Sequence, residues 1–146
     1  MVIERAKKRD LPDVLGLLER HQLPLADLEH HIDTMVVARN AGRVVGVAGL
    51  ELYADGALLR SVAVDPALQG KGVGHQLTES ALAMAREHGV ENVFLLTTTA
   101  EGFFPKFGFA LIQRNDVPRS VQSSVEFQSA CPASAVVMRK ALVGSL

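Results

Sequence analysis

The sequence lacks the features that mark secreted and membrane-spanning proteins. Its one cysteine, Cys131, cannot form a disulfide within the chain, which fits a reducing compartment. No apolar run approaches the roughly 20 residues that a membrane span needs. Charged residues interrupt any signal-peptide pattern at Glu4, Arg5, Lys7 and Lys8. We therefore expect a cytoplasmic protein with no membrane partner.

An excess of one charge is also lacking. The chain has 15 basic and 16 acidic residues, a net charge of −1 and 5% aromatic residues. Without a basic run, nucleic acid has no electrostatic reason to bind. The 146 residues are 48% hydrophobic and their mean hydropathy is +0.18, which is enough to fill one core. We expect a single domain over residues 1–146, with no repeat and no linker.

Strand and helix patterns alternate along the chain, which predicts an α/β (α+β) fold. The first helix is expected to begin at an N-cap, Asp10, and a second, short helix is expected at 25–32. A longer helix has one apolar face from Val73 to Met84 and should end where Gly89 can adopt a left-handed conformation. Strands are expected at 1–6, 35–39, 44–53, 57–64, 92–97 and 135–139.

A glycine-rich loop between a strand and a helix is the most informative feature. Gly70, Gly72 and Gly74 leave backbone N–H groups uncovered where the helix begins. These donors and the helix dipole favour a phosphate or pyrophosphate. The loop has neither the spacing of a P-loop nor that of the G-x-G-x-x-G dinucleotide fingerprint. The two common nucleotide-binding patterns are therefore excluded.

The loop does match another pattern. Gln69 to Gly74 reads as [Q/R]-x-x-G-x-[G/A] and resembles the acetyl-coenzyme A loop of the GCN5-related N-acetyltransferases (GNAT). The sequence AEGFFPKFGF at 100–109 looks like the second motif of that superfamily, and 5–18 with 36–50 resembles its opening elements. More narrowly, LLRSVAVDP and LLTTTAEGFF resemble the small N-acetyltransferases of arsenic-resistance operons.

This resemblance implies a mixed sheet whose parallel fourth and fifth strands splay apart, with the pantetheine arm of acetyl-coenzyme A in the split. Backbone groups of Val62 and Val64 would pair with the pantetheine amides, and amides at 70–75 would hold the pyrophosphate. Lys71 could add a charge. The cofactor-binding residues expected from the resemblance are Val62, Ala63, Val64, Gln69, Gly70, Lys71, Gly72, Val73, Gly74, His75, Thr98 and Phe104.

The implied reaction is direct acetyl transfer to the amine of a small molecule, either amino-acid-like or an arsenical or phosphinic compound. Many relatives use a tyrosine to protonate the departing thiolate, but this chain has Phe103 and Phe104 there. The acid is therefore unassigned, with Tyr53 as a weak substitute. Glu51 is the candidate base. Arg60, on a central strand, either pairs with Glu51 or anchors an anionic group of the acceptor.

No metal is expected, because the adjacent His30 and His31 do not converge on a helix. Cys131 is more consistent with a small buried residue than with a nucleophile. A non-catalytic acetyl-coenzyme A sensor is the alternative function, since the usual tyrosine is missing. The polar segment 112–132, with helical turns expected near 117–123, should cover the site or form the interface of a homodimer.

Overall fold

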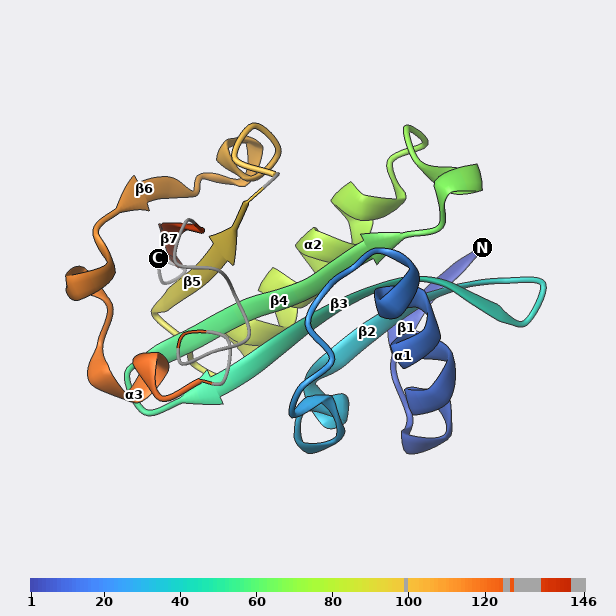
Figure 1. The fold of residues 1–146 in the computed structure, drawn as a ribbon, viewed down its shortest axis with the longest axis horizontal. Helices are drawn as coiled ribbons and strands as arrows, with labels where there is room; N and C mark the ends of the chain where they lie inside the picture. The colour runs from blue at the N-terminus through green and yellow to red at the C-terminus, as the bar shows by residue number, and fades with distance from the viewer. Residues whose placement is uncertain (99, 125–126, 128–134, 143–146) are drawn as a thin grey trace.

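A single mixed sheet organises the fold. The computed structural model describes residues 1–98, 100–124, 127 and 135–142. The strands of this part follow the order β1-β2-β3-β4-β5-β7-β6 (Figure 1). All neighbouring pairs are antiparallel except the parallel pair β4 and β5. The strands are β1 (Val2–Arg5), β2 (Met35–Asn40), β3 (Arg43–Tyr53), β4 (Gly56–Val64), β5 (Asn92–Thr97), β6 (Ala110–Ile112) and β7 (Val136–Ala141).

Strands β4 and β5 separate soon after they begin, as the resemblance predicted. Their only paired residues are Ala57 with Val93 and Leu58 with Phe94. Beyond these, β4 continues to Val64, whereas β5 pairs along its length with β7. Figure 1 shows the two strands diverging from this point. The result is a gap in the middle of the sheet, where β4 keeps β3 as its partner on one side but has no partner strand on the side of β5.

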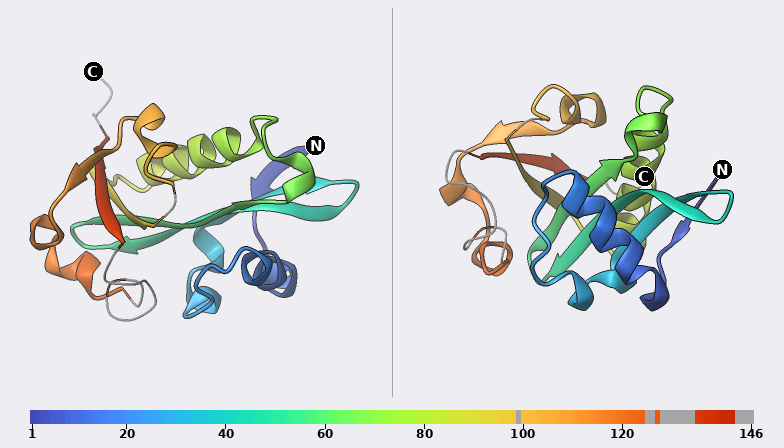
Figure 2. Two further views of the ribbon diagram at one scale, coloured as in Figure 1. Left: turned by 45° about the horizontal axis from the view of Figure 1, so that its top comes forward. Right: turned by 45° about the vertical axis from the view of Figure 1, so that its right-hand side comes forward.

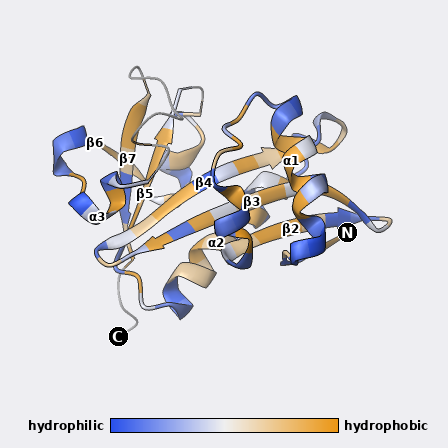
Figure 3. Cartoon of the chain, turned by 60° about the horizontal axis from the view of Figure 1, so that its bottom comes forward, coloured by the Kyte–Doolittle hydropathy of each residue, from blue (hydrophilic) through white to orange (hydrophobic). Residues whose placement is uncertain are grey.

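The two longer helices cover opposite faces of the sheet (Figure 2). Helix α2 (Val73–Glu87) packs its buried face, including Leu77 and Ala81, on one side. Helix α1 (Leu11–Arg20) packs Val14 and Leu18 on the other. Figure 3 shows hydrophobic colouring along the central strands between them. Burial of these apolar faces fixes both helices to the sheet. The segments at the two ends of the gap are therefore attached to one rigid support.

Strand β4 contains a bulge next to the gap. Val47 pairs with Ala63 but Gly49 pairs with Arg60, so β4 has one residue more than β3 in this interval. The extra residue places Ser61 at a φ of 62°, in the left-handed region. Bulges bend a strand and redirect its side chains. Here the bulge separates the buried side chain of Arg60 from the residues that line the gap.

Short helical turns complete the described chain. They connect the strands and place the loops at the two ends of the gap. The α-helical turn is α3 (Arg119–Gln122), and the 3-10 turns are η1 (Lys8–Asp10), η2 (Leu28–His30), η3 (Ile32–Thr34), η4 (Pro66–Leu68), η5 (Phe104–Phe107) and η6 (Arg114–Asp116).

The expected strands and the long helix are confirmed, but one expected helix is wrong. The helix expected at 25–32 is replaced by η2 and η3, because Asp27 has a φ of 68° and a helix cannot continue through it. Asp10 is the N-cap of α1, as expected, although its side chain makes no capping hydrogen bond there. After β5, Thr97 Oγ1 accepts from the N–H of Ala100 at 2.9 Å. The sequence pattern also missed β6.

Candidate active site

A cavity of about 510 Å³ lies where β4, the glycine-rich loop and η5 meet. Gly70 and Gly72 have φ values of +81° and +82°, which favour glycine. Gly72 is the N-cap of α2, so the uncapped N–H groups of the first turn begin beside the cavity. The residues lining the cavity are His21, Val62, Ala63, Val64, Gln69, Gly70, Gly72, Gly74, His75, Phe103 and Lys106.

The backbone of β4 faces this cavity at alternate residues. Asp65 N–H donates to Val45 O at 2.7 Å, so the backbone groups of Val64 point away from β3 and into the gap. The Val64 carbonyl is already occupied, because it accepts from Gln69 Nε2 at 3.0 Å and lies 2.8 Å from His21 Nε2. The Val64 N–H and the backbone of Val62 are the groups that fit the expected pairing with pantetheine.

Most residues of the expected cofactor site line the cavity, but four do not. Lys71 and Thr98 are exposed. Val73 and Phe104 are buried in the core, with 1% and 6% of their surface exposed. Eight other residues expected from the resemblance are among the lining residues, and three were missed: His21, Phe103 and Lys106. His21 could not be found from the loop motif, because it comes from the end of α1, far away in sequence.

Four phenylalanines pack together beside the cavity, and one of them lines it. Phe103 packs against Phe104 and Phe107 with ring centroids 5.1 and 5.2 Å apart, and Phe104 packs against Phe109 at 5.8 Å. Phe103, not Phe104, faces the cavity. Lys106 Nζ lies over the Phe103 ring, 5.2 Å from its centroid, so a cation stands at the rim. A wall of this kind suits an apolar chain that ends in phosphates.

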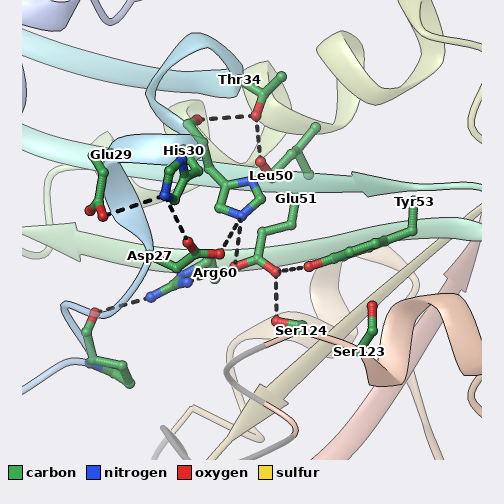
Figure 4. Close-up of polar contacts among 12 residues, drawn as sticks. Asp27, Glu29, His30, Thr34, Leu50, Glu51, Tyr53, Arg60, Ser123 and Ser124 are labelled. Carbon is green, nitrogen blue, oxygen red and sulfur yellow. Dashed lines mark hydrogen bonds and ion pairs between the residues drawn. The ribbon is translucent and has the colours of Figure 1, made fainter.

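A buried polar cluster lies beyond the bulge (Figure 4). Its centre is Glu51, which has no exposed surface. Arg60 Nη1 donates to Glu51 Oε2 at 2.6 Å, Ser124 Oγ donates to Oε1 at 2.5 Å, and Tyr53 also donates its hydroxyl hydrogen to Oε1. Three donors from three segments of the chain therefore converge on one carboxylate and hold it in place.

Arg60 uses its guanidinium within the protein. Besides the contact with Glu51, its Nε donates to Ser61 Oγ at 3.1 Å and its Nη2 to Pro24 O at 3.2 Å. The Arg60 side chain has no exposed surface. Of the two alternatives for Arg60, the structure has the ion pair with Glu51, because a charge on a central strand needs a partner.

Two further ionisable groups border the cluster. His31 Nε2 lies 3.2 Å from Asp27 Oδ2 and 3.8 Å from Glu51 Oε2, and 17% of the His31 side chain is exposed. Burial, together with the hydrogen bond to Glu51, raises the pKa of Tyr53 above its ordinary value. Because a thiol has a pKa of about 8.5, a phenol of raised pKa is a poor acid for a departing thiolate. Tyr53 is therefore not a good replacement for the usual tyrosine.

The remaining candidates from the sequence are a metal site near His30, the cysteine and a membrane span. Within the described residues, Asp27, Glu29 and His30 bring ligand atoms within 4.8 Å of one another, but two of the three are exposed and form an ordinary surface cluster. Cys131 lies outside the described residues. Among the helices of the described chain, none is long and apolar enough to cross a membrane.

Comparison with known proteins gives one family. Residues 31–111 match the acetyltransferase (GNAT) domain. An amino-acid acetyltransferase from Mycobacterium tuberculosis is 33% identical over 130 residues, which are 82% of this chain and 74% of that protein. The amino-acid acetyltransferase of Neisseria meningitidis serogroup B is 28% identical over 127 residues, but this chain spans only 29% of its length.

Solved structures show the same fold. Rv2747 from Mycobacterium tuberculosis, crystallised in complex with CoA and NLQ, has a TM-score of 0.82 at 28% identity, with 98% of this chain and 100% of that chain covered. N-acetylglutamate synthase from Neisseria gonorrhoeae, complexed with coenzyme A and N-acetyl-glutamate, has a TM-score of 0.84 at 24% identity, with 98% and 35% covered. These named relatives do not support the expected likeness to arsenic-resistance enzymes, which is thereby corrected.

Proposed function

The chain belongs to the GNAT family of acetyltransferases, and we propose from this premise that it transfers acetyl to the α-amine of a free amino acid. The chain is an acetyl-coenzyme A-dependent N-acetyltransferase, so the non-catalytic sensor is set aside. The choice of acceptor rests on the relatives, which are amino-acid acetyltransferases, and on the buried ionic cluster beside the gap.

The observation that supports the proposal most is the gap between β4 and β5, with an anion-binding loop at one end and the Glu51 cluster at the other. An acetyl-coenzyme A whose phosphates meet the loop would direct its thioester along β4 towards the bulge at Ser61. An acceptor entering from the side of Glu51 would then meet the thioester carbonyl. Holding two reactants in such an arrangement replaces a bimolecular encounter and accounts for much of the rate of an enzyme.

From the neutral amine, the reaction moves one acetyl group and one proton. The amine attacks the thioester carbonyl, the N–C bond forms and the C–S bond breaks, and the proton lost by the attacking nitrogen ends on the departing sulfur, so the products are an amide and coenzyme A thiol. An amino acid arrives as an ammonium ion and must lose a proton first. Glu51 is the proposed acceptor of that proton. Because Glu51 is fully buried, the proton would pass through His31, which is partly exposed and 3.8 Å away.

Arg60 has a different role in this proposal from the one first expected. Its contacts with Glu51 and with the Pro24 carbonyl hold the base and the segment that follows α1 in place. Arg60 is therefore proposed as a positioning residue, and the anchoring of an acceptor carboxylate is no longer assigned to it.

A thiol-release assay tests the acceptor class. Purified protein and acetyl-coenzyme A are offered each free amino acid, the matching amino-acid amides, small alkylamines, and the phosphinic and arsinic analogues of glutamate. We expect the highest kcat/KM for a free amino acid. Turnover confined to alkylamines or to the arsinic analogue would overturn the proposal, and the Gly74→Asp variant reports the background rate of thioester hydrolysis.

A further inference from the structure

His21 follows α1, and each of its ring nitrogens faces a main-chain carbonyl. Nδ1 lies 2.9 Å from Leu17 O and Nε2 lies 2.8 Å from Val64 O. A carbonyl oxygen can only accept a hydrogen bond, so both contacts are hydrogen bonds only when both ring nitrogens carry hydrogen. With its hydrogen on Nε2, the ring donates to Val64 O and joins the end of α1 to the end of β4.

One side of His21 belongs to the cofactor cavity. His21 lines this cavity together with the loop residues Gly70 and Gly72. The carbonyl that it contacts, Val64 O, also accepts from Gln69 Nε2 of the same loop. The His21 ring therefore contacts the cavity and the loop together, whereas Lys71, the cation within the glycine loop itself, is exposed and does not line the cavity.

The segment that begins at His21 also contacts the buried cluster around Glu51. His21 begins the segment 21–34, which joins α1 to β2. Within this segment, the Pro24 carbonyl accepts from Arg60 Nη2 at 3.2 Å. His31, farther along, lies 3.8 Å from the carboxylate of Glu51. One short segment thus contacts the cavity at its first residue and the buried ion pair at later ones.

We propose that His21 is a positioning residue that couples coenzyme A binding to the acceptor-side segment 21–34. This inference rests on the proposed function. A cofactor in the cavity would pack against the His21 ring and against the loop whose Gln69 shares the Val64 carbonyl with it, which fixes the start of the segment. By linkage, an ordered segment also favours the cofactor. His75 on α2 and Lys106 on η5 are the other ionisable residues that line the cavity with His21, while Arg20 and Asp65 are the neighbours in sequence of His21 and Val64.

The chain contains a matched control. His88 stands at the end of α2 as His21 stands at the end of α1, and its Nδ1 lies 2.9 Å from Met84 O. No strand carbonyl faces its Nε2 in the described structure. His88→Ala therefore removes a helix-end contact without a bridge. At position 21, the longer side chain of His21→Gln places its amide nitrogen within reach of Val64 O. The shorter side chain of His21→Asn reaches only the carbonyl of Leu17 at the end of the helix.

Two measurements test the proposal, calorimetry with free coenzyme A and hydrogen exchange of 22–34 with and without coenzyme A. We expect His21→Asn to weaken coenzyme A binding about tenfold, and His21→Gln and His88→Ala to stay near wild type. In the wild type and these two variants, saturating coenzyme A should slow exchange in 22–34 by roughly fivefold or more. In His21→Asn this slowing should be lost.

The outcomes separate the inference from the proposed function. If the wild type does not bind coenzyme A, the function itself fails. If the wild type binds coenzyme A but 22–34 is not protected, or if His21→Asn keeps both affinity and protection, the coupling role of His21 is overturned. Weak binding with full protection at saturation in His21→Asn would also overturn the coupling. Circular dichroism and thermal midpoints establish that each variant is folded. If His21→Asn is not folded, the affinity and protection measured for His21→Gln decide the test.

Discussion

Arg60 Nη1 lies 2.6 Å from Glu51 Oε2, and neither side chain has any exposed surface. The pair joins β3 to β4 immediately before the bulge at Ser61. Desolvation of two charges is costly, so such a pair adds less to stability than its short distance suggests. Removing one partner, however, leaves a buried charge without its neighbour.

Arg60→Met should therefore lower the free energy of unfolding by about 3–5 kcal/mol. Glu51→Met combined with Arg60→Met removes both charges, and it should recover a large part of that loss. Urea unfolding of the wild type, both single variants and the double variant gives the coupling energy. Losses that simply add would show that the two side chains act independently.

Glu51→Gln tests the proposed base. It should lower kcat and remove the acidic limb of the pH profile, because an amide cannot take the ammonium proton. The Kd for coenzyme A should not change. Ser124→Ala is the matched control, since it removes one donor to Glu51 but keeps the carboxylate, and it should keep the acidic limb. An unaltered pH profile in Glu51→Gln would assign the base elsewhere.

Tyr53→Phe tests whether the phenol is the general acid. Burial and Glu51 raise the pKa of Tyr53, so the phenol keeps its proton when the thiolate departs. We expect kcat to stay within about fivefold and the alkaline limb to stay in place. A neutral phenol stabilises the fold below its unfolded pKa of about 10, and this stability is lost as pH rises through the raised folded pKa. The phenylalanine variant should therefore lose less stability than wild type above pH ~10.

Gly74→Asp tests the cofactor cavity. A Cβ at Gly74 would meet Val64 Cγ2 at 3.6 Å and Phe103 Cζ at 3.7 Å, which is ordinary contact. Gly74→Ala should therefore keep most of the affinity for coenzyme A. The aspartate adds a negative charge beside the phosphates and should weaken binding by about tenfold or more. Equal affinities of the two variants, measured by calorimetry, would contradict a phosphate site at this loop.

Asp10→Asn tests the ion pair that joins the start of α1 to β2. Arg39 Nη2 donates to Asp10 Oδ2 at 2.7 Å, and this hydrogen bond holds the pKa of Asp10 below its usual value. The stability that it gives is complete above the unfolded pKa of about 3.9 and is lost as pH falls through the folded pKa. At neutral pH the variant should lose about 1.5–3 kcal/mol. Its stability should also fall less than that of wild type between pH ~4 and 2, as thermal unfolding at each pH would show.

Local sequence patterns determined much of the fold. The alternating strands, the long helix with Val73 and Leu77 on its buried face, and the glycine at position 89 all follow from periodicity and from backbone preference. The glycine loop also indicated its ligand, because uncovered N–H groups at a helix start are a local property. Each of these features depends on residues close together in the chain.

Contacts between distant segments were decided only by the tertiary structure. No local pattern places His21 against Val64, or Ser124 against Glu51, since these pairs are 43 and 73 residues apart. The loss of the helix at 25–32 has the same cause, because contacts of Pro24 and His31 with the buried pair accompany the turn at Asp27. The sequence thus determined a fold and a cofactor loop. Packing across the sheet decided which charges pair and which remain at the site, because a buried charge must find its partner wherever the fold brings one near.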